Sequence, residues 1–336
     1  MGLPIIIYLF LGGAGAGACL VLSCLSFMRP VAATGDRESF HIAGRGGHAP
    51  GAFRGPLSSG RAFRTFIGSG YVASAGFLFM GICSLLVDLG RTDRLSFLIT
   101  HPSLSYISIG AYSLAFCLLL TVFLAAVWFF AFPSLPHLVL VIVRLVAIAV
   151  SFVVMVYTGL LLASIASVPF WNSWCVPVLF ALSAASCGIA LIVLTTCCTG
   201  LLRTFDGLLR VLIVFDFLII LLEAGATVVL MAVSLNGADP WSLASADLLG
   251  KYAGTARMDL AALAAADLIG GDLSQWFWGG YVALGLVAPV VLGEMARAST
   301  RAWQKMMLLF SMSVLFGGFI MRSCIVFAGT QVGSMI

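Results

Sequence analysis

Long apolar stretches alternate with polar connections along almost the whole chain. A helix needs about 20 apolar residues to cross the hydrocarbon core of a bilayer. Eight stretches reach this length: Pro4–Met28, Gly68–Leu89, Ser103–Phe132, His137–Ala163, Asn172–Gly200, Leu208–Leu235, Gln275–Ala296 and Met306–Thr330. The pattern predicts an all-α integral membrane protein with eight transmembrane helices.

The composition supports this class and excludes a soluble domain. Hydrophobic residues make up 62% of the 336 residues and charged residues only 9%, whereas a soluble domain carries about 25% charged residues. We do not expect the first stretch to be a cleaved signal peptide, because no basic residue precedes it and its apolar run is too long for a signal core.

The basic residues of the connections are divided unequally between the two sides of the predicted helices. Eleven lie in or beside the connections after the first, third, fifth and seventh helices, and four lie in the opposite connections. Because arginine and lysine mark the cytoplasmic side, this asymmetry predicts that both chain termini are outside.

Two connections are long. Residues 29–67 are rich in glycine and arginine and too poor in apolar residues to order themselves, so we expect a flexible cytoplasmic linker ending in a short interfacial turn at Ser59–Phe66. Topology explains the arginines of this linker without nucleic acid as a partner. Residues 236–274 form an outer loop with acids spaced among alanine and leucine, which predicts short amphipathic helices on the outer surface.

The first helix contains Gly13 and Gly17 at the spacing of a close helix–helix contact. Tyr8 lies near its outer end. Two interpretations of Tyr8 stay open: a tyrosine of the interfacial aromatic belt, and a hydroxyl that points into a cavity.

Charged residues gather at the outer end of the second helix. Asp88 closes its apolar run, and Arg91 and His101 follow before the next helix. Ionisable groups near the hydrocarbon are usually buried in protein or line a polar pocket. A helix end whose charges lie among the lipid headgroups is the competing interpretation.

Four charged residues lie inside the helices. Asp216 and Glu223 are seven residues apart, so they share one helix face about 10 Å apart along the axis. Arg144 lies at about the depth of Asp216, and Arg322 at about that of Glu223, so we predict two acid–arginine pairs. Such pairs either hold helices together or serve as stations on a proton path.

Resident metal centres are not indicated. All nine cysteines fall within the apolar stretches and no Cys-x-x-Cys pair occurs, while the four histidines lie in connections or at helix ends. Haem b between helices needs histidines well inside them. We therefore expect no haem and no iron–sulfur cluster in this chain.

Four segments of the sequence stand out together: YLFLGGAGAGA in the first helix, LVDLGRTDR at the end of the second, GLLLASIASVPFWNS between the fourth and fifth, and GGFIMRSCIVFAG in the last. In this order they resemble the NrfD/PsrC family of quinone-reactive membrane subunits of molybdopterin oxidoreductases. In the second segment Thr92 stands where the family has proline. The two long connections depart from the family in length and content.

The resemblance implies two four-helix bundles, residues 1–163 and 172–336, in a bacterial cell membrane. It also implies a menaquinone pocket near the outer surface of the first bundle, a four-cluster iron–sulfur subunit docked outside, and a molybdopterin or other catalytic subunit beyond it. The family's polar positions around the quinone map to Tyr8, Asp88 and Tyr157.

Quinone chemistry moves protons as well as electrons, so the pocket needs hydrogen-bonding groups and a titratable relay. We assign Asp88, Tyr157 and His101 to proton exchange, with His101 as the relay to outer water and Arg91 stabilising negative charge. The predicted quinone-binding residues are Tyr8, Asp88, Arg91, Tyr106, Tyr157, Trp171 and Asn172. The proton-path candidates are Arg144, Asp216, Glu223 and Arg322.

Two other functions remain open. A proton-coupled secondary transporter would use the buried charges to line a substrate path, although no two helices are broken at corresponding midplane positions. A membrane anchor without quinone chemistry would use the charges only to hold helices together. Co-purifying iron–sulfur subunits argue against the transporter, and extractable menaquinone argues against the bare anchor.

Overall fold

The computed structural model describes residues 2–27, 60–89, 106–130, 136–165, 167–236, 250–298 and 303–333. Within these ranges, side-chain positions are described for all residues except 61, 88–89, 106–108, 250–259, 297–298 and 332–333. The helices are α1 Leu3–Ser26, α2 Gly60–Leu89, α4 Tyr106–Phe130, α5 His137–Ala163, α6 Cys175–Cys198, α7 Asp206–Asn236, α8 Gly250–Gly270, the π-helix η3 Trp276–Val287, α9 Ala288–Ala298 and α10 Trp303–Gly333.

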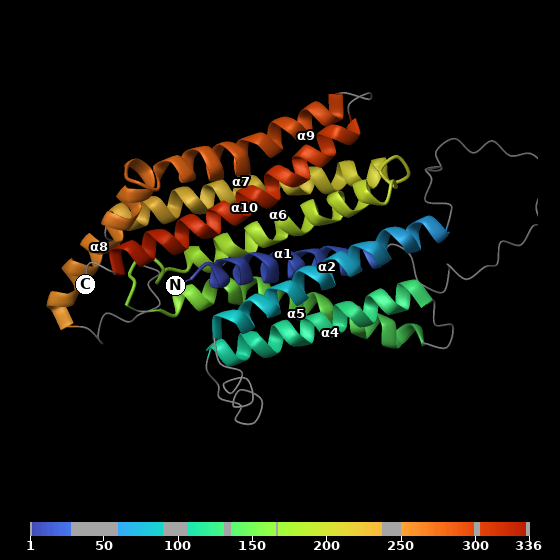
Figure 1. Cartoon of the computed structure of the whole chain (residues 1–336), viewed down its shortest axis with the longest axis horizontal. Helices are drawn as coiled ribbons and strands as arrows, with labels where there is room; N and C mark the ends of the chain where they lie inside the picture. Colours follow the sequence, from blue (N-terminus) through green and yellow to red (C-terminus); the bar gives the residue numbers. More distant parts are fainter. Residues whose placement is uncertain are drawn as a thin grey trace, which may run out of the picture.

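Eight helical segments of the described chain are long and apolar enough to cross a membrane, so the predicted fold class is confirmed. They run roughly side by side, and α1 begins at the same end of the assembly at which α10 ends (Figure 1). That this end faces the outside stays a prediction. Many lipid-facing side chains, such as Leu119 and Leu221, are apolar and exposed.

The helices pack in two groups that meet along one seam. Helices α1, α2, α4 and α5 pack around one another, and α6, α7, the η3–α9 segment and α10 form the second group. The seam is built mainly by α1 and α6, the two helices with the largest buried share. Figure 1 shows both in the middle of the assembly.

Small residues make the seam close, as the spacing of Gly13 and Gly17 predicts. A Cβ on Gly17 would overlap the backbone of Ala184, and one on Gly188 would overlap the backbone of Gly17. Because lipid removes the hydrophobic drive between helices, such close backbone packing is a main source of helix association in a bilayer.

Helix α2 begins much earlier than predicted. The expected interfacial turn at Ser59–Phe66 is wrong, because residues 60–67 are the first turns of one continuous helix that runs to Leu89. Phe63, Phe66 and Ile67 are all buried. The spacing of these three residues places them on one helix face, and Phe66 stacks on Phe205 with ring centroids 4.6 Å apart.

The predicted outer loop contains an ordered helix. Helix α8 packs on α7 and α10 and buries Ala264, Ala265 and Leu268. It lies at the end of the assembly where α7 ends (Figure 1). The seventh apolar stretch begins as the π-helix η3, where Gly285 approaches the backbone of Gly317 on α10. π-Helical segments are rare and often occur at functional sites.

Candidate functional site

Two buried tyrosines meet inside the first helix group. Tyr8 of α1 and Tyr157 of α5 are 2% and 6% exposed, and their hydroxyl groups interact with each other. The ring of Tyr157 lies on Gly110 of α4, where a Cβ would overlap it. Burial excludes the aromatic-belt interpretation of Tyr8, since a belt tyrosine keeps its hydroxyl at the wet interface.

Helix α2 ends at the same end of the molecule, and the predicted charged stretch begins in its last turn. Asp88 lies in the last turn of α2, but its side chain is outside the described positions, and Arg91 and His101 lie outside the described residues. The Ser84 hydroxyl donates a hydrogen bond to the Pro4 carbonyl at 2.8 Å. This bond joins the turn before Asp88 to the turn of α1 before Tyr8.

Tyr106 begins α4, and its side chain is likewise outside the described positions. It stands four residues before Gly110, and residues four apart lie on the same face of an α-helix. The backbone therefore brings Tyr106 to the helix face against which Tyr157 packs. Whether its hydroxyl joins the two buried ones stays a prediction.

Trp171 and Asn172 contact protein in the turn between α5 and α6. The Trp171 indole N–H donates to the Ile325 carbonyl of α10 at 2.8 Å, and its ring lies on Gly329. The Asn172 amide donates to the Ala163 carbonyl at 2.8 Å. The Trp171 contacts tie the turn to α10 of the second helix group, and the Asn172 contact ties it to the end of α5 in the first. A part of either residue in cofactor binding stays a prediction.

Arg322 lies at the seam between the two helix groups. Its Nη1 donates to the Ser183 hydroxyl at 3.1 Å and to the Gly318 carbonyl at 2.9 Å. The guanidinium lies between the Phe10 and Phe180 rings, 5.7 and 5.4 Å from their centroids. A Cβ on Gly13 would be only 3.1 Å from Nη2, so a glycine of α1 makes room for this cation.

Glu223 and Asp216 are buried on the same face of α7, as their spacing predicts. Glu223 interacts electrostatically with Arg322, Tyr281 and Ser183, although no Glu223–Arg322 ion pair is found within 4.0 Å in the described part of the chain. Asp216 is 0% exposed, and neither carboxylate oxygen has a hydrogen-bond partner. Its polar neighbour is Ser186 of α6.

The predicted pair of Arg144 and Asp216 is wrong. Arg144 projects from α5 in the first helix group, where its Nη1 donates to the Ser26 carbonyl at 3.1 Å. Asp216 projects from α7 in the second group. The sequence predicts only a similar depth in the membrane for these two residues. Their positions in the plane of the membrane depend on helix packing, which places them in different helix groups.

Sequence reasoning missed the hydroxyl groups that complete the second cluster. Tyr281 of η3 and Thr227 of α7 share a hydrogen bond of 2.7 Å between their hydroxyls, and both are buried. Thr227 lies four residues after Glu223, which places it on the acidic face of α7. The sequence spacing of Glu223 and Thr227 could have predicted this neighbourhood. No feature of the sequence around Tyr281 indicated that its hydroxyl would join the cluster.

The fold and these two clusters define a class: a multi-pass membrane protein with polar side chains buried at one end of the first helix group and along the second. The family model for polysulphide reductase NrfD matches residues 49–333. This match covers more than half of the chain, so the chain belongs to the NrfD family. A comparison with curated proteins found no match.

Family membership defines the general role. The chain is a membrane subunit of a complex of the polysulphide- or nitrite-reductase type. Subunits of this family work together with iron–sulfur and catalytic subunits.

Proposed function

We propose that this chain exchanges electrons and protons between membrane menaquinone and an iron–sulfur subunit docked on its outer face. The observation that carries the proposal is the meeting of the Tyr8 and Tyr157 hydroxyls, from two different helices, in the buried interior of the first helix group. A molybdopterin or other catalytic subunit would stand beyond the iron–sulfur subunit.

The donor set suits a quinone head. Each hydroxyl carries one proton and can also accept a hydrogen bond. A quinone presents carbonyl oxygens that accept such bonds, so the two tyrosine hydroxyls are suitable donors for its head.

When bound, the quinone supplies two-electron, two-proton redox chemistry. Tyr8 and Tyr157 would hold and orient its head by hydrogen bonds donated from their O–H groups. Asp88, in the last turn of α2 at this end, takes up or releases the proton, and His101 passes it to the outer water. Arg91 keeps nearby negative charge stable. In this proposal the electrons come from the partner's metal centres, which would lie close to this end.

Substitution of the two tyrosines tests the proposal in the purified complex. Tyr8→Phe and Tyr157→Phe remove one hydroxyl each and keep the ring. We expect each to lower quinol-linked turnover at least about tenfold, which corresponds to the loss of a hydrogen bond worth about 1.4 kcal/mol. The complex should still contain its iron–sulfur and catalytic subunits.

Tyr71→Phe is the matched control. Tyr71 is a buried tyrosine of the same helix group, but its hydroxyl bonds to Ser23, well away from Tyr8 along α1. Its removal should leave turnover unchanged. Wild-type turnover in both Tyr8→Phe and Tyr157→Phe, together with no extractable menaquinone, would favour an anchor without quinone chemistry.

A proton path through the second helix group is a further part of this proposal. The supporting observation is the alignment of Asp216, Glu223 and Thr227 on one face of α7, which continues through the Tyr281 hydroxyl. The positive charge of Arg322, which lies at the seam, would influence proton exchange at Glu223. Because Arg144 lies in the other helix group, it does not belong to this series.

The transporter alternative has less support. Family membership connects the chain with a redox complex. Co-purification with iron–sulfur and molybdenum-containing subunits would support the redox proposal. A chain that is isolated alone and moves a solute with protons would support the transporter.

A further inference from the structure

Arg144 is a buried cation whose charge has no anionic partner in the described part of the chain. Its side chain is 2% exposed, and the ion pair found among the described residues is Arg210–Asp206. Burying a charge without a counter-charge is strongly unfavourable. The hydrogen bond to the Ser26 carbonyl satisfies one nitrogen but brings only a partial negative charge.

The unpaired atoms of Arg144 form one edge of its guanidinium. Nε and Nη2 are buried without a hydrogen-bond partner, while Nη1 is bonded. The Nε–H and Nη2–H bonds point the same way, and together they form the side-on fork that arginine uses for two oxygens of a carboxylate or phosphate. The free edge is therefore the one built for bidentate binding of an oxyanion.

A third unpaired donor belongs to a ring that the Arg144 guanidinium contacts. The Trp128 indole Nε1 is also buried without a partner, and the Arg144 guanidinium carbon is 5.7 Å from the centroid of a Trp128 ring. Three buried N–H groups from α4 and α5 thus lack acceptors within one small region. An ion with three or more acceptor oxygens would satisfy all of them.

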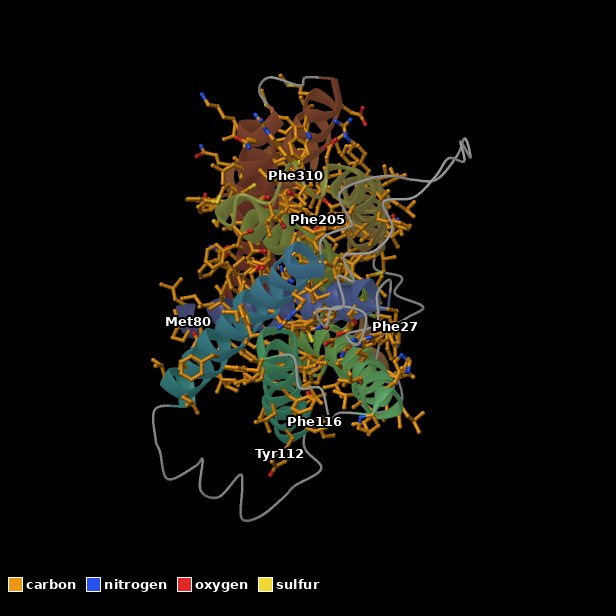
Figure 2. The ribbon with its side chains drawn as sticks, turned by 90° about the vertical axis from the view of Figure 1, so that its right-hand side faces the viewer. Phe27, Met80, Tyr112, Phe116, Phe205 and Phe310 are labelled. Carbon is orange, nitrogen blue, oxygen red and sulfur yellow. The ribbon has the colours of Figure 1, made fainter. Side chains whose placement is uncertain are left out.

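The position of this region suits an ion from the membrane interface. Ser26 is the last residue of α1, so the guanidinium lies level with a helix end rather than at the bilayer centre. Phe27, whose ring is 5.6 Å from the guanidinium, is exposed. Figure 2 shows Phe27 at the flank of the molecule.

The surface around this region is apolar. Leu138, Ile142 and Leu145 of α5 are exposed on either side of Arg144 in the sequence. Acyl chains pack on such surfaces. Arg64 donates to the Trp128 and Phe129 carbonyls, so a second arginine contacts the backbone of the tryptophan of this region.

Arg322 is also buried and has more partners than Arg144, although its Nε likewise has no hydrogen-bond partner. Its two terminal nitrogens donate to Ser183, Gly318 and Phe180, and Glu223 supplies negative charge. Arg144 lacks a carboxylate among the described residues and lacks acceptors on its bidentate edge. The difference indicates that Arg144 has an external partner.

We propose that Arg144 and Trp128 bind a phosphate group at the end of the first helix group where α1 ends. A phospholipid headgroup or inorganic phosphate can supply this group. The phosphate oxygens would accept from Nε and Nη2 of Arg144 and from Nε1 of Trp128. The site is separate from the Tyr8–Tyr157 pair, which lies toward the opposite ends of α1 and α5, and it does not depend on the proposed quinone function.

Native mass spectrometry and thermal unfolding of the purified full chain test the site. The probes are phosphatidylglycerol, in one series, and inorganic phosphate alone, in the other. Trp128→Phe removes one donor and keeps an aromatic ring, and Arg144→Lys keeps the charge and removes the bidentate edge. We expect about tenfold weaker binding for each variant, as for the loss of one hydrogen bond to a charged acceptor.

Arg210→Gln is the control, since it removes a half-exposed arginine that is paired with Asp206 on the surface. It should bind like the wild type. Specific adducts of phosphatidylglycerol that weaken in both variants support a lipid as the source, and stabilisation by phosphate alone that is lost in both supports the free ion. Equal binding of both probes by wild type, Trp128→Phe and Arg144→Lys would overturn the proposal and leave water as the partner of these donors.

Discussion

The Tyr157 ring lies directly on the backbone of Gly110, so that a Cβ on residue 110 would overlap the ring and its hydroxyl oxygen. Gly110 is in α4 and Tyr157 in α5, and this contact allows the Tyr157 hydroxyl to reach the Tyr8 hydroxyl of α1. The absence of a side chain at Gly110 in α4 thus determines where the Tyr157 hydroxyl of α5 lies.

We expect Gly110→Ala to displace the Tyr157 hydroxyl. The added methyl group overpacks a buried contact, which typically destabilises a protein by about 1–3 kcal/mol. Quinol-linked turnover of the complex should fall about tenfold or more, and the thermal unfolding temperature should fall as well. Gly76→Ala is the control, because a Cβ there meets nothing within 4 Å. Wild-type turnover in Gly110→Ala would show that this packing does not position a functional hydroxyl.

Asp88→Asn should abolish quinol-linked turnover while the complex stays assembled. Asparagine keeps the size and most of the hydrogen-bonding capacity of aspartate but cannot take up or release a proton at the required point. Turnover with quinol is compared with partner subunit content after purification. An unchanged rate would remove Asp88 from the mechanism.

Glu223→Gln should slow the formation of a pH gradient by the complex in proteoliposomes. The substitution keeps the shape of the side chain next to Arg322 and Tyr281 but removes a titratable station from the inner face of α7. Asp206→Asn, at the exposed start of the same helix, serves as the control. If both variants build the gradient at the wild-type rate, Glu223 only holds helices together.

Trp171→Phe distinguishes a packing role from a binding role. The substitution removes the N–H that bonds to the Ile325 carbonyl, and the net loss of one hydrogen bond typically lowers stability by about 0.5–1.5 kcal/mol. We expect a lower unfolding temperature in detergent with menaquinone content unchanged. Loss of menaquinone at unchanged stability would instead place Trp171 in the cofactor site.

Much of the architecture follows from the order of the residues alone. The apolar stretches predict eight membrane-spanning helices because a bilayer demands long runs of apolar residues with every backbone group bonded internally. The bounds of α5 agree with the prediction to the residue. The spacing of Gly13 and Gly17 predicts the close seam, and that of Asp216 and Glu223 predicts their shared face, because both depend only on helical periodicity.

Other features depend on which helices become neighbours. The sequence predicts residues 60–67 as part of a linker, yet they are helical. Phe63 packs on Trp128 and Phe66 on Phe205, and both partners are distant in the chain. Arg144 and Asp216 share a depth but belong to different helix groups, and Tyr281 joins the acidic face of α7 through a contact across helices.

The physical reason is that sequence specifies position along each helix, whereas neighbours depend on how the side-chain surfaces of all helices fit together. Depth, face and spacing were therefore determined by the sequence itself. The meeting of Tyr8 with Tyr157, the separation of Arg144 from the acids, and the unpaired donors beside Trp128 were decided by the tertiary structure, because each depends on the packing of helices that are separate in the chain.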